Sequence, residues 1–220
     1  MGQSKMRRLM VILMALVMTM AMIVPSFAAT TSPSEGGTAK TAVIKSVTTE
    51  AFYNSASIKV TYKASNATKY KVAYRVAGGK WKTFTTTKKG SCTIDGLTKG
   101  KLYQVKVAGI NKNGKAGKYS SVKYRYLAKV THKVKSPKTK QIKVTWNKVS
   151  SATGYVIFYS KNSNMSGYKT KTVTGGSKTS ATISSLTKGK TYYVRVRPVK
   201  KYSGTTYKGV LTAKKSVKVK

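Results

Sequence analysis

The feature of this sequence that most limits its fold is a stretch that occurs twice. Residues 97–107 read LTKGKLYQVKV and residues 186–196 read LTKGKTYYVRV, at an offset of 89 residues. Repetition of a whole segment at this spacing predicts two copies of one small domain rather than one larger fold. A chain of 220 residues has room for two such copies.

Within the repeat, apolar and polar side chains alternate as they do in a β-strand with one buried face. Tyr103, Val105 and Val107 alternate with polar residues after a Lys-Gly turn. The second copy repeats the alternation from Tyr192 to Val196. No 3.6-residue period follows residue 28, so the pattern predicts short strands joined by turns and an all-β fold.

The pattern Leu-x-x-Gly-x-x-Tyr-x-Val-x-Val resembles the fibronectin type III module. In such sandwiches a tyrosine near this strand turns its hydroxyl back to nearby backbone, the tyrosine corner, and Tyr103 and Tyr192 match that position. The resemblance covers about residues 42–220 and implies two tandem immunoglobulin-like β-sandwiches. The lysine-rich composition resembles modules in secreted proteins of Gram-positive bacteria. This family is used for spacing, adhesion and ligand binding alike, so the resemblance specifies the fold better than the function.

We expect module 1 over residues 42–127 and module 2 over residues 128–220. The last strand of module 1 is predicted over about residues 118–126. Trp146 matches a tryptophan of the family, whereas module 1 has Tyr62 in its place. The predicted structural core is anchored by one aromatic residue and the repeated leucine and tyrosine of each module: Tyr62, Leu97, Tyr103, Trp146, Leu186 and Tyr192.

Residues 1–28 are typical of a secretory signal peptide. A basic start precedes the uncharged apolar run Leu9–Val24, and the small residues Ser26 and Ala28 stand where a signal peptidase reads. An uncleaved membrane anchor is the alternative, but the run is shorter than the roughly 18–20 residues of a spanning helix. Residues 29–41 are small and polar and are predicted to be a flexible linker. We therefore expect a secreted, extracellular protein, either free or associated with the cell wall. We expect neither a wall-sorting signal nor a third domain after the last strand.

Few residues could carry catalysis or bind a metal. The only carboxylates are Glu35, Glu50 and Asp95, which are scattered, whereas glycoside hydrolysis needs two that lie close together. His132 is the only histidine, and a zinc site needs several ligands. Cys92 is predicted to be a small buried residue, with an intermolecular disulfide as the alternative. We therefore expect no catalytic residue, no metal site, no small-molecule cofactor and no enzymatic activity.

The charge is the strongest functional signal. The chain carries 44 basic and 3 acidic residues, a formal charge of +41, which favours contact with polyanions. Lysine on exposed strands also blocks edge-to-edge aggregation, but that role does not require acids to be so rare. Lysine greatly outnumbers arginine, which favours diffuse attraction over bidentate recognition. The candidate polyanion-binding residues are outward or near the C-terminus: Lys59, Lys63, Lys71, Lys106, Lys143, Arg195, Arg197, Lys214, Lys215, Lys218 and Lys220.

Two aromatic residues, Trp81 and Tyr168, are candidates for stacking on sugar rings, with packing between strands as the alternative. The first hypothesis is a secreted, non-catalytic binding or spacer protein of the cell envelope. Its expected partners are anionic envelope polymers such as teichoic acids or acidic polysaccharide, and other secreted or surface proteins. The alternatives are a carbohydrate-binding accessory module that uses exposed aromatics, and binding of extracellular nucleic acid. Salt separates them, because charge-driven binding weakens with salt and stacking on a neutral sugar does not.

Overall fold

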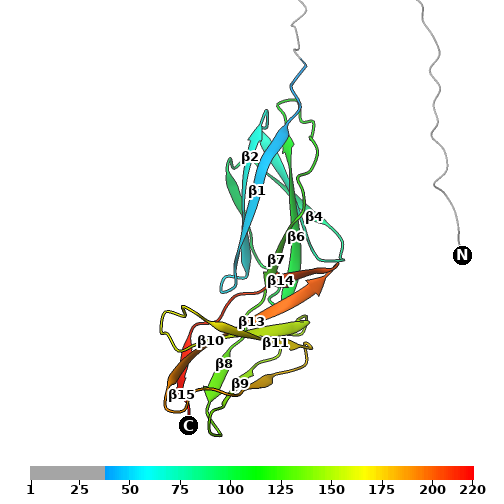
Figure 1. Cartoon of the computed structure of the whole chain (residues 1–220). Coiled ribbons are helices and arrows are strands. Elements are labelled where there is room, and N and C mark those ends of the chain that lie inside the picture. Colours follow the sequence, from blue (N-terminus) through cyan, green and yellow to red (C-terminus); the bar gives the residue numbers. More distant parts are fainter. Residues whose placement is uncertain (1–37) are drawn as a thin grey trace, which may run out of the picture. The chain divides into compact units, whose positions relative to one another are not determined.

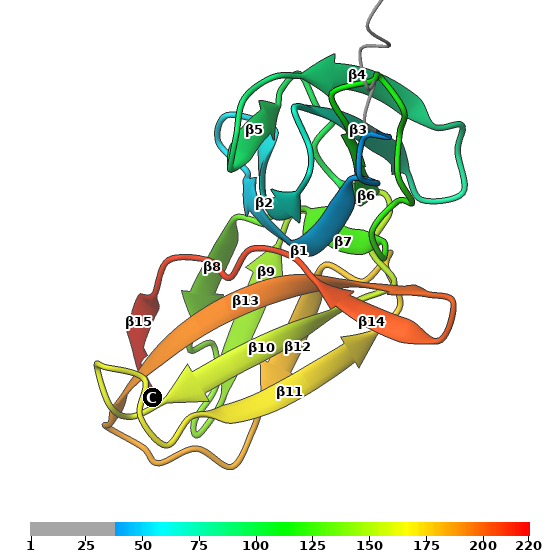
Figure 2. The same ribbon diagram turned by 90° about the horizontal axis from the view of Figure 1, so that it is seen from above.

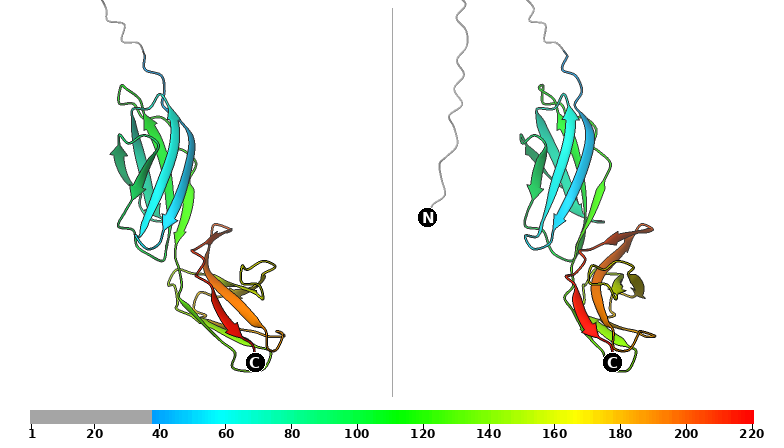
Figure 3. Two further views of the ribbon diagram at one scale, coloured as in Figure 1. Left: turned by 90° about the vertical axis from the view of Figure 1, so that its left-hand side faces the viewer. Right: turned by 60° about the vertical axis from the view of Figure 1, so that its left-hand side comes forward.

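The computed structural model describes residues 38–220, which contain fifteen strands (Figure 1). Strands gather into two groups, module 1 in blue to green and module 2 in yellow-green to red (Figure 3). The predicted all-β fold with two tandem sandwiches is confirmed. The predicted signal peptide, residues 1–28, and most of the predicted linker, residues 29–41, lie outside the described residues. Within residues 38–220 there is no helix of the length and apolarity needed to cross a membrane.

Module 1 is a sandwich of a three-stranded sheet, β1-β2-β5, and a four-stranded sheet, β4-β3-β6-β7. All its strand pairs are antiparallel. The strands are β1 (Val43–Phe52), β2 (Ser57–Ser65), β3 (Lys69–Val76), β4 (Lys82–Thr86), β5 (Ser91–Ile94), β6 (Lys101–Ile110) and β7 (Lys123–Leu127).

Module 2 repeats this arrangement with a three-stranded sheet, β12-β9-β8, and a sheet in the order β11-β10-β13-β14, where β15 also pairs with β13. Figure 2 shows β11, β10 and β13 side by side in front of the smaller sheet. Strand β14 forms a hairpin with the end of β13, where module 1 has only the isolated bridge between Ile110 and Ala116. The strands are β8 (His132–Lys135), β9 (Ile142–Trp146), β10 (Gly154–Ser160), β11 (Lys169–Thr174), β12 (Ser180–Ile183), β13 (Thr191–Tyr202), β14 (Thr205–Lys208) and β15 (Lys215–Lys218).

Alternation along each strand separates the core from the solvent. In β2, Ile58, Val60 and Tyr62 are buried while Lys59 and Thr61 are exposed. Each apolar side chain removed from water contributes about 1.5–3 kcal/mol to the driving force for folding. The six predicted core residues are all buried, with at most 7% of any side chain exposed: Tyr62, Leu97, Tyr103, Trp146, Leu186 and Tyr192.

Both tyrosines of the repeat form the predicted tyrosine corner. The hydroxyl of Tyr103 accepts a hydrogen bond from the Thr98 backbone N–H at 2.8 Å. The hydroxyl of Tyr192 accepts the same bond from the Thr187 N–H at 3.2 Å. Each tyrosine thereby satisfies a backbone donor of the turn five residues before it, which would otherwise lose its partner on leaving water.

The Lys-Gly turn of the repeat needs its glycine. Gly100 and Gly189 have φ values of 80° and 76°, a left-handed conformation that glycine adopts without steric cost. In that conformation the Gly100 N–H donates to the Leu127 carbonyl at 2.7 Å, and the Gly189 N–H donates to the Val219 carbonyl at 2.8 Å. The turn therefore ties the end of each module's last strand to the start of the strand that carries the corner tyrosine.

The last strand of module 1 is shorter than the predicted range 118–126, because regular pairing begins only at β7. Before it, the hydroxyl of Ser120 accepts a hydrogen bond from the Val107 N–H at 3.1 Å, in place of a backbone carbonyl. In module 2 the hydroxyl of Thr212 accepts from the Val196 N–H at 2.9 Å. A hydroxyl side chain thus replaces a ladder acceptor in both modules, and strand geometry is interrupted there.

Side chains from the end of β7 reach both hydrophobic cores. Leu127 lies in the core of module 1, whereas the neighbouring Tyr126 packs with the core of module 2. The Tyr126 hydroxyl lies 3.2 Å from the hydroxyl of Ser151, and burial raises the pKa of Tyr126 to about 12. Tyr124 stacks on Tyr207 with their ring centroids 4.7 Å apart. These contacts join the two sandwiches through aromatic packing.

Candidate anion-binding surface

Positive charge dominates the described part of the chain. Of the 44 lysines and arginines, only Lys5, Arg7 and Arg8 precede residue 38, which leaves 41 within residues 38–220. The same residues hold two acidic side chains, Glu50 and Asp95, both exposed and both in module 1. Module 2, residues 128–220, has no aspartate or glutamate at all. Its cationic side chains therefore have no acidic side chain of their own module to pair with.

The predicted polyanion-binding residues do not gather in one patch. Some lie on the smaller sheets, others on the larger sheets, and a third group lies on or beside β15. Seven of these side chains are exposed: Lys59, Lys63, Lys143, Lys214, Lys215, Lys218 and Lys220. Four are half-buried: Lys71, Lys106, Arg195 and Arg197. Exposed lysines on several faces of two modules provide many weak contacts rather than one strong site.

Trp81 of module 1 lies under two cations of its own sheet. The Arg75 guanidinium and the Lys106 ammonium each lie 4.4 Å from the centroid of the Trp81 ring. The same ammonium lies 4.3 Å from the ring of Tyr119. Arg75 is held by a hydrogen bond of 2.5 Å from its Nε to the side-chain oxygen of Gln104. The ring of Trp81 is half-buried and stabilised by cation–π contacts, so its free surface for a sugar is small.

Tyr168 of module 2 is the more open of the two predicted stacking residues, with 54% of its surface exposed. Its ring meets that of Phe158 edge to face, with centroids 5.3 Å apart and planes at 62°. The Arg197 guanidinium lies over the ring of Phe158, 5.5 Å from its centroid. These three side chains line a groove of about 750 Å³ on the outward face of β10, β11 and β13, called here the outer groove. Thr172, Lys201 and Lys208 also line it.

The sequence alone does not predict the outer groove as a site. The sequence predicts Arg197 as a polyanion contact and Tyr168 as a stacking residue for separate reasons, and it does not single out Phe158. The available signal was the alternation in β10, where Ile157 is buried and its neighbours Val156 and Phe158 face outward. Strand register then places Phe158 next to Arg195 and Val156 next to Arg197.

Three of the four arginines in residues 38–220 donate a hydrogen bond from Nε to the protein, and Arg197 does not. The Nε of Arg75 donates to Gln104, the Nε of Arg125 donates to the Thr49 carbonyl at 2.7 Å, and the Nε of Arg195 donates to the Thr212 carbonyl at 2.7 Å. The Nε of Arg197 is buried and has no hydrogen-bond partner within the described residues. Burial, and then the charge of Arg195, lowers the pKa of Arg197. A buried donor without an acceptor costs about 1–3 kcal/mol.

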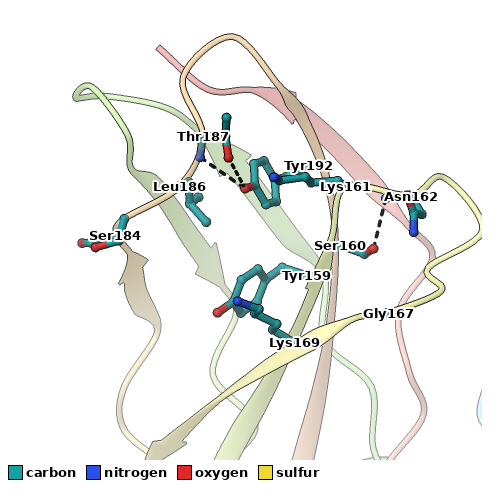
Figure 4. A pocket seen from close by; sticks show the side chains of 11 residues that line it. Tyr159, Ser160, Lys161, Asn162, Gly167, Lys169, Ser184, Leu186, Thr187 and Tyr192 are labelled. Atoms are coloured by element: carbon teal, nitrogen blue, oxygen red, sulfur yellow. Dashed lines mark hydrogen bonds between the residues drawn. The ribbon is translucent and has the colours of Figure 1, made fainter.

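A second hollow of about 530 Å³ lies near the tyrosine corner of module 2 (Figure 4). Tyr159, Lys161, Lys169 and Tyr192 are among the residues that line it. Burial raises the pKa of Tyr192, but the hydrogen bonds with Thr187 and the charges of the two lysines outweigh burial and lower it. The hydroxyl of Tyr192 is already used in the tyrosine-corner hydrogen bond, so this residue of the hollow has a structural role.

His132 and Cys92 are both buried in module cores. The Nε2 of His132 lies 3.2 Å from the Val194 carbonyl, to which its N–H donates. Burial lowers the pKa of His132, and the charge of Lys215 lowers it further against the effect of that hydrogen bond. Burial also raises the pKa of the Cys92 thiol. Within residues 38–220, no three His, Cys, Asp or Glu side chains are grouped closely enough to hold a metal ion.

The match to a family of known proteins agrees with this architecture. The fibronectin type III domain family matches residues 44–123 and 130–214. A two-domain fibronectin type III segment of chicken tenascin is similar at a TM-score of 0.45 and 16% identity, covering 80% of this chain and 99% of that one. The FN1–FN3 domains of chicken CNTN1 are similar at a TM-score of 0.35 and 21% identity, covering 80% of this chain and 66% of that one. The comparison with curated proteins found no match. The two matched segments make up most of the chain, which therefore belongs to the fibronectin type III domain family.

Proposed function

We propose that this chain is a secreted, non-catalytic binding or spacer protein of the cell envelope, held by its basic surface to anionic wall polymers. Tandem fibronectin type III domains generally act as binding or spacer modules without catalysis. The observation that carries the finer proposal is the imbalance of charge: 41 basic side chains against two acidic ones in residues 38–220. Such a surface raises the local concentration of polyanions through its summed field.

The distribution of the lysines supports diffuse attraction. Exposed lysines lie on both modules, among them Lys59 on β2, Lys143 on β9 and Lys215 on β15. An isolated exposed charge pair contributes only about 0–1 kcal/mol, so firm retention requires many contacts at once. Each contact that displaces a counterion makes the sum more sensitive to salt.

The test is retention of the purified protein on isolated cell walls across a salt series, with intact walls compared with walls stripped of anionic polymer. We expect strong retention on intact walls at low salt, a steep fall as salt rises, and little retention on stripped walls. Equal retention on both, unchanged by salt, would contradict the electrostatic mechanism and favour stacking on neutral sugar. Stronger binding to DNA than to intact walls under the same salt would favour the nucleic-acid alternative.

Two matched variants separate diffuse attraction from a local patch. One replaces Lys214, Lys215, Lys218 and Lys220 by Gln, which keeps most of each side chain and removes four charges near the C-terminus. The other replaces four exposed lysines of the smaller sheets by Gln: Lys59, Lys63, Lys133 and Lys143. Diffuse attraction predicts that both variants lose wall retention to a similar extent and that single substitutions have little effect. A large loss in one variant alone would show a localised site.

A further inference from the structure

The outer groove of module 2 combines three features that diffuse attraction does not need. It has an exposed aromatic ring in Tyr168, a second ring in Phe158 set edge to face against it, and a half-buried arginine. Its volume of about 750 Å³ lies within the range of small-molecule sites, roughly 300–1,000 Å³. Exposed lysines on β13 and β14, Lys201 and Lys208, stand at its edge.

Arg197 supplies the polar side of the groove. Its Nε is buried without an acceptor, while the three other arginines of residues 38–220 each direct Nε to an oxygen of the protein. No aspartate or glutamate exists in module 2 to provide that acceptor. The Nε has almost no accessible surface, so a ligand oxygen would pair instead with the two Nη groups of this half-buried side chain, which make no hydrogen bond within residues 38–220. A carboxylate fits best, because the planar guanidinium fork binds it with two parallel hydrogen bonds.

The aromatic side of the groove argues for a ring attached to that carboxylate. The Arg197 guanidinium lies over the ring of Phe158, 5.5 Å from its centroid, and the exposed ring of Tyr168 lies 5.3 Å from that of Phe158. The open aromatic surface next to the arginine is therefore that of Tyr168. A phosphate chain carries negative charge but offers little apolar surface for such a ring. A sugar ring offers its C–H faces, and the hydroxyls of Thr172 and Thr206 in the same groove suit its alcohols.

We propose that the outer groove binds a uronic acid unit of an acidic polysaccharide, with the sugar carboxylate on Arg197 and the sugar ring against the exposed ring of Tyr168. This inference deepens the proposed function by naming one ligand class and one site. It rests on the proposed function only in that the ligand is an envelope polymer. Binding in the groove depends on the guanidinium fork and the ring of Tyr168, and it therefore survives salt that abolishes diffuse retention.

The experiment is isothermal titration calorimetry of the full chain with tetragalacturonate, at low and at high salt. Galactotetraose, which lacks the carboxylates, and a glycerol phosphate oligomer, which lacks the sugar ring, are the comparison ligands. We expect saturable binding of one tetragalacturonate that persists at high salt, and no comparable binding of either comparison ligand. Equal binding of the glycerol phosphate oligomer at high salt would overturn the assignment of a uronic acid.

Arg197→Lys tests the fork because it keeps the charge and loses the bidentate geometry. Loss of hydrogen bonds to a charged group predicts a weakening of roughly tenfold to a hundredfold. Arg195→Lys is the matched control: it makes the same change two residues away on the same face, but its Nε is already bonded to the Thr212 carbonyl. The control is expected to bind as the unmodified chain does. Tetragalacturonate binding that Arg197→Lys does not change would overturn the proposal.

Tyr168→Ala provides a second variant whose folding is not in question, because its side chain is largely exposed in a loop. We expect it to weaken tetragalacturonate binding at least about tenfold while leaving wall retention at low salt unchanged. The two hypotheses can therefore fail separately. If the unmodified chain binds tetragalacturonate but its wall retention does not depend on salt, only the diffuse mechanism is contradicted. If its wall retention depends on salt but it does not bind tetragalacturonate, only the groove proposal is contradicted.

Discussion

Modules 1 and 2 place different aromatic side chains at the same point of the same sheet. Tyr62 in β2 donates its hydroxyl to the Lys88 carbonyl at 2.7 Å, and Trp146 in β9 donates its indole N–H to the Lys178 carbonyl at 3.1 Å. Both accepting carbonyls lie in the loop before the strand that completes the sheet. The shared requirement is a large ring that fills the core and a polar tip that satisfies one loop carbonyl. Two residue types meet it.

The outward faces of the larger sheets differ much more than the cores. In module 1, Lys71 pairs with Ala108 and Ala73 pairs with Lys106 across β3 and β6. In module 2 the equivalent pairs are Val156 with Arg197 and Phe158 with Arg195. These residues replace each lysine–alanine pair with an arginine beside a larger apolar side chain. The repeat therefore preserves the packing of the cores, whereas the outward faces of the larger sheets carry different side chains.

The largest expected effect comes from removing the indole ring of Trp146, where module 1 has Tyr62 instead. Trp146→Ala should lower the free energy of unfolding of module 2 by about 3–5 kcal/mol, the cost of truncating a large buried side chain. Urea unfolding followed by circular dichroism measures it. Trp146→Phe, which keeps a ring and loses the bond to Lys178, is the control and should cost about 1–2 kcal/mol. An unchanged unfolding midpoint in Trp146→Ala would contradict the buried placement of the indole.

The same variant measures how far the two cores unfold separately. The chain has two tryptophans, so Trp146→Ala leaves Trp81 as a fluorescent reporter of module 1 alone. We expect the Trp81 transition to shift much less than that of module 2. A small shift is expected, because Tyr124 and Tyr126 at the end of module 1 contact module 2. Equal shifts in both modules would show that the aromatic contacts make one cooperative unit.

A smaller effect is expected at the tyrosine corners, which are the most similar part of the two modules. Tyr103→Phe and Tyr192→Phe each leave a turn N–H without its acceptor and should lower the free energy of unfolding by about 1–2 kcal/mol. Tyr103→Phe should cost more, because its bond is 2.8 Å long against 3.2 Å for Tyr192. Tyr119→Phe is the control, because this side chain is 37% exposed. It should change the free energy of unfolding by less than about 0.5 kcal/mol in the same urea experiment. The reverse order of the two corner variants would contradict the inference from bond length.

What could be predicted from the sequence was local. The alternation from Tyr103 to Val107 sets which side chains enter the core, and the Lys-Gly turn needs only a glycine at its centre. The equivalence of Cys92 with Ala181 is likewise visible, and the two pair with Val60 and Val144 at matching places in their sheets. The alternation and the turn depend on residues within a few positions of one another, and the equivalence of Cys92 with Ala181 follows from the offset of 89 residues between the two copies.

What could not be predicted depends on contacts between distant strands. The outer groove needs the register of β10 against β13 and the position of the loop that carries Tyr168, and neither follows from alternation alone. Whether an arginine Nε already has an acceptor depends on a residue such as Thr212, 17 positions after Arg195. The cations over Trp81 come from two different strands, β3 and β6. The sequence alone therefore does not show that two cations of the protein already lie over the ring of Trp81.

The smallest expected effect comes from His132, which faces Trp146 across β8 and β9 where module 1 has Val47 facing Tyr62. Burial lowers the pKa of His132 in the folded protein below that of the unfolded chain, about 6.5. The unfolded state therefore binds more protons below pH 6.5, and the free energy of unfolding of module 2 falls as the pH falls through that value. Between pH 7.5 and 5.5 the loss should reach at most about 1.4 kcal/mol, measured by urea unfolding. His132→Val gives module 2 the residue of module 1 and should remove this dependence. If the loss persists in His132→Val, a group other than the histidine must titrate on unfolding.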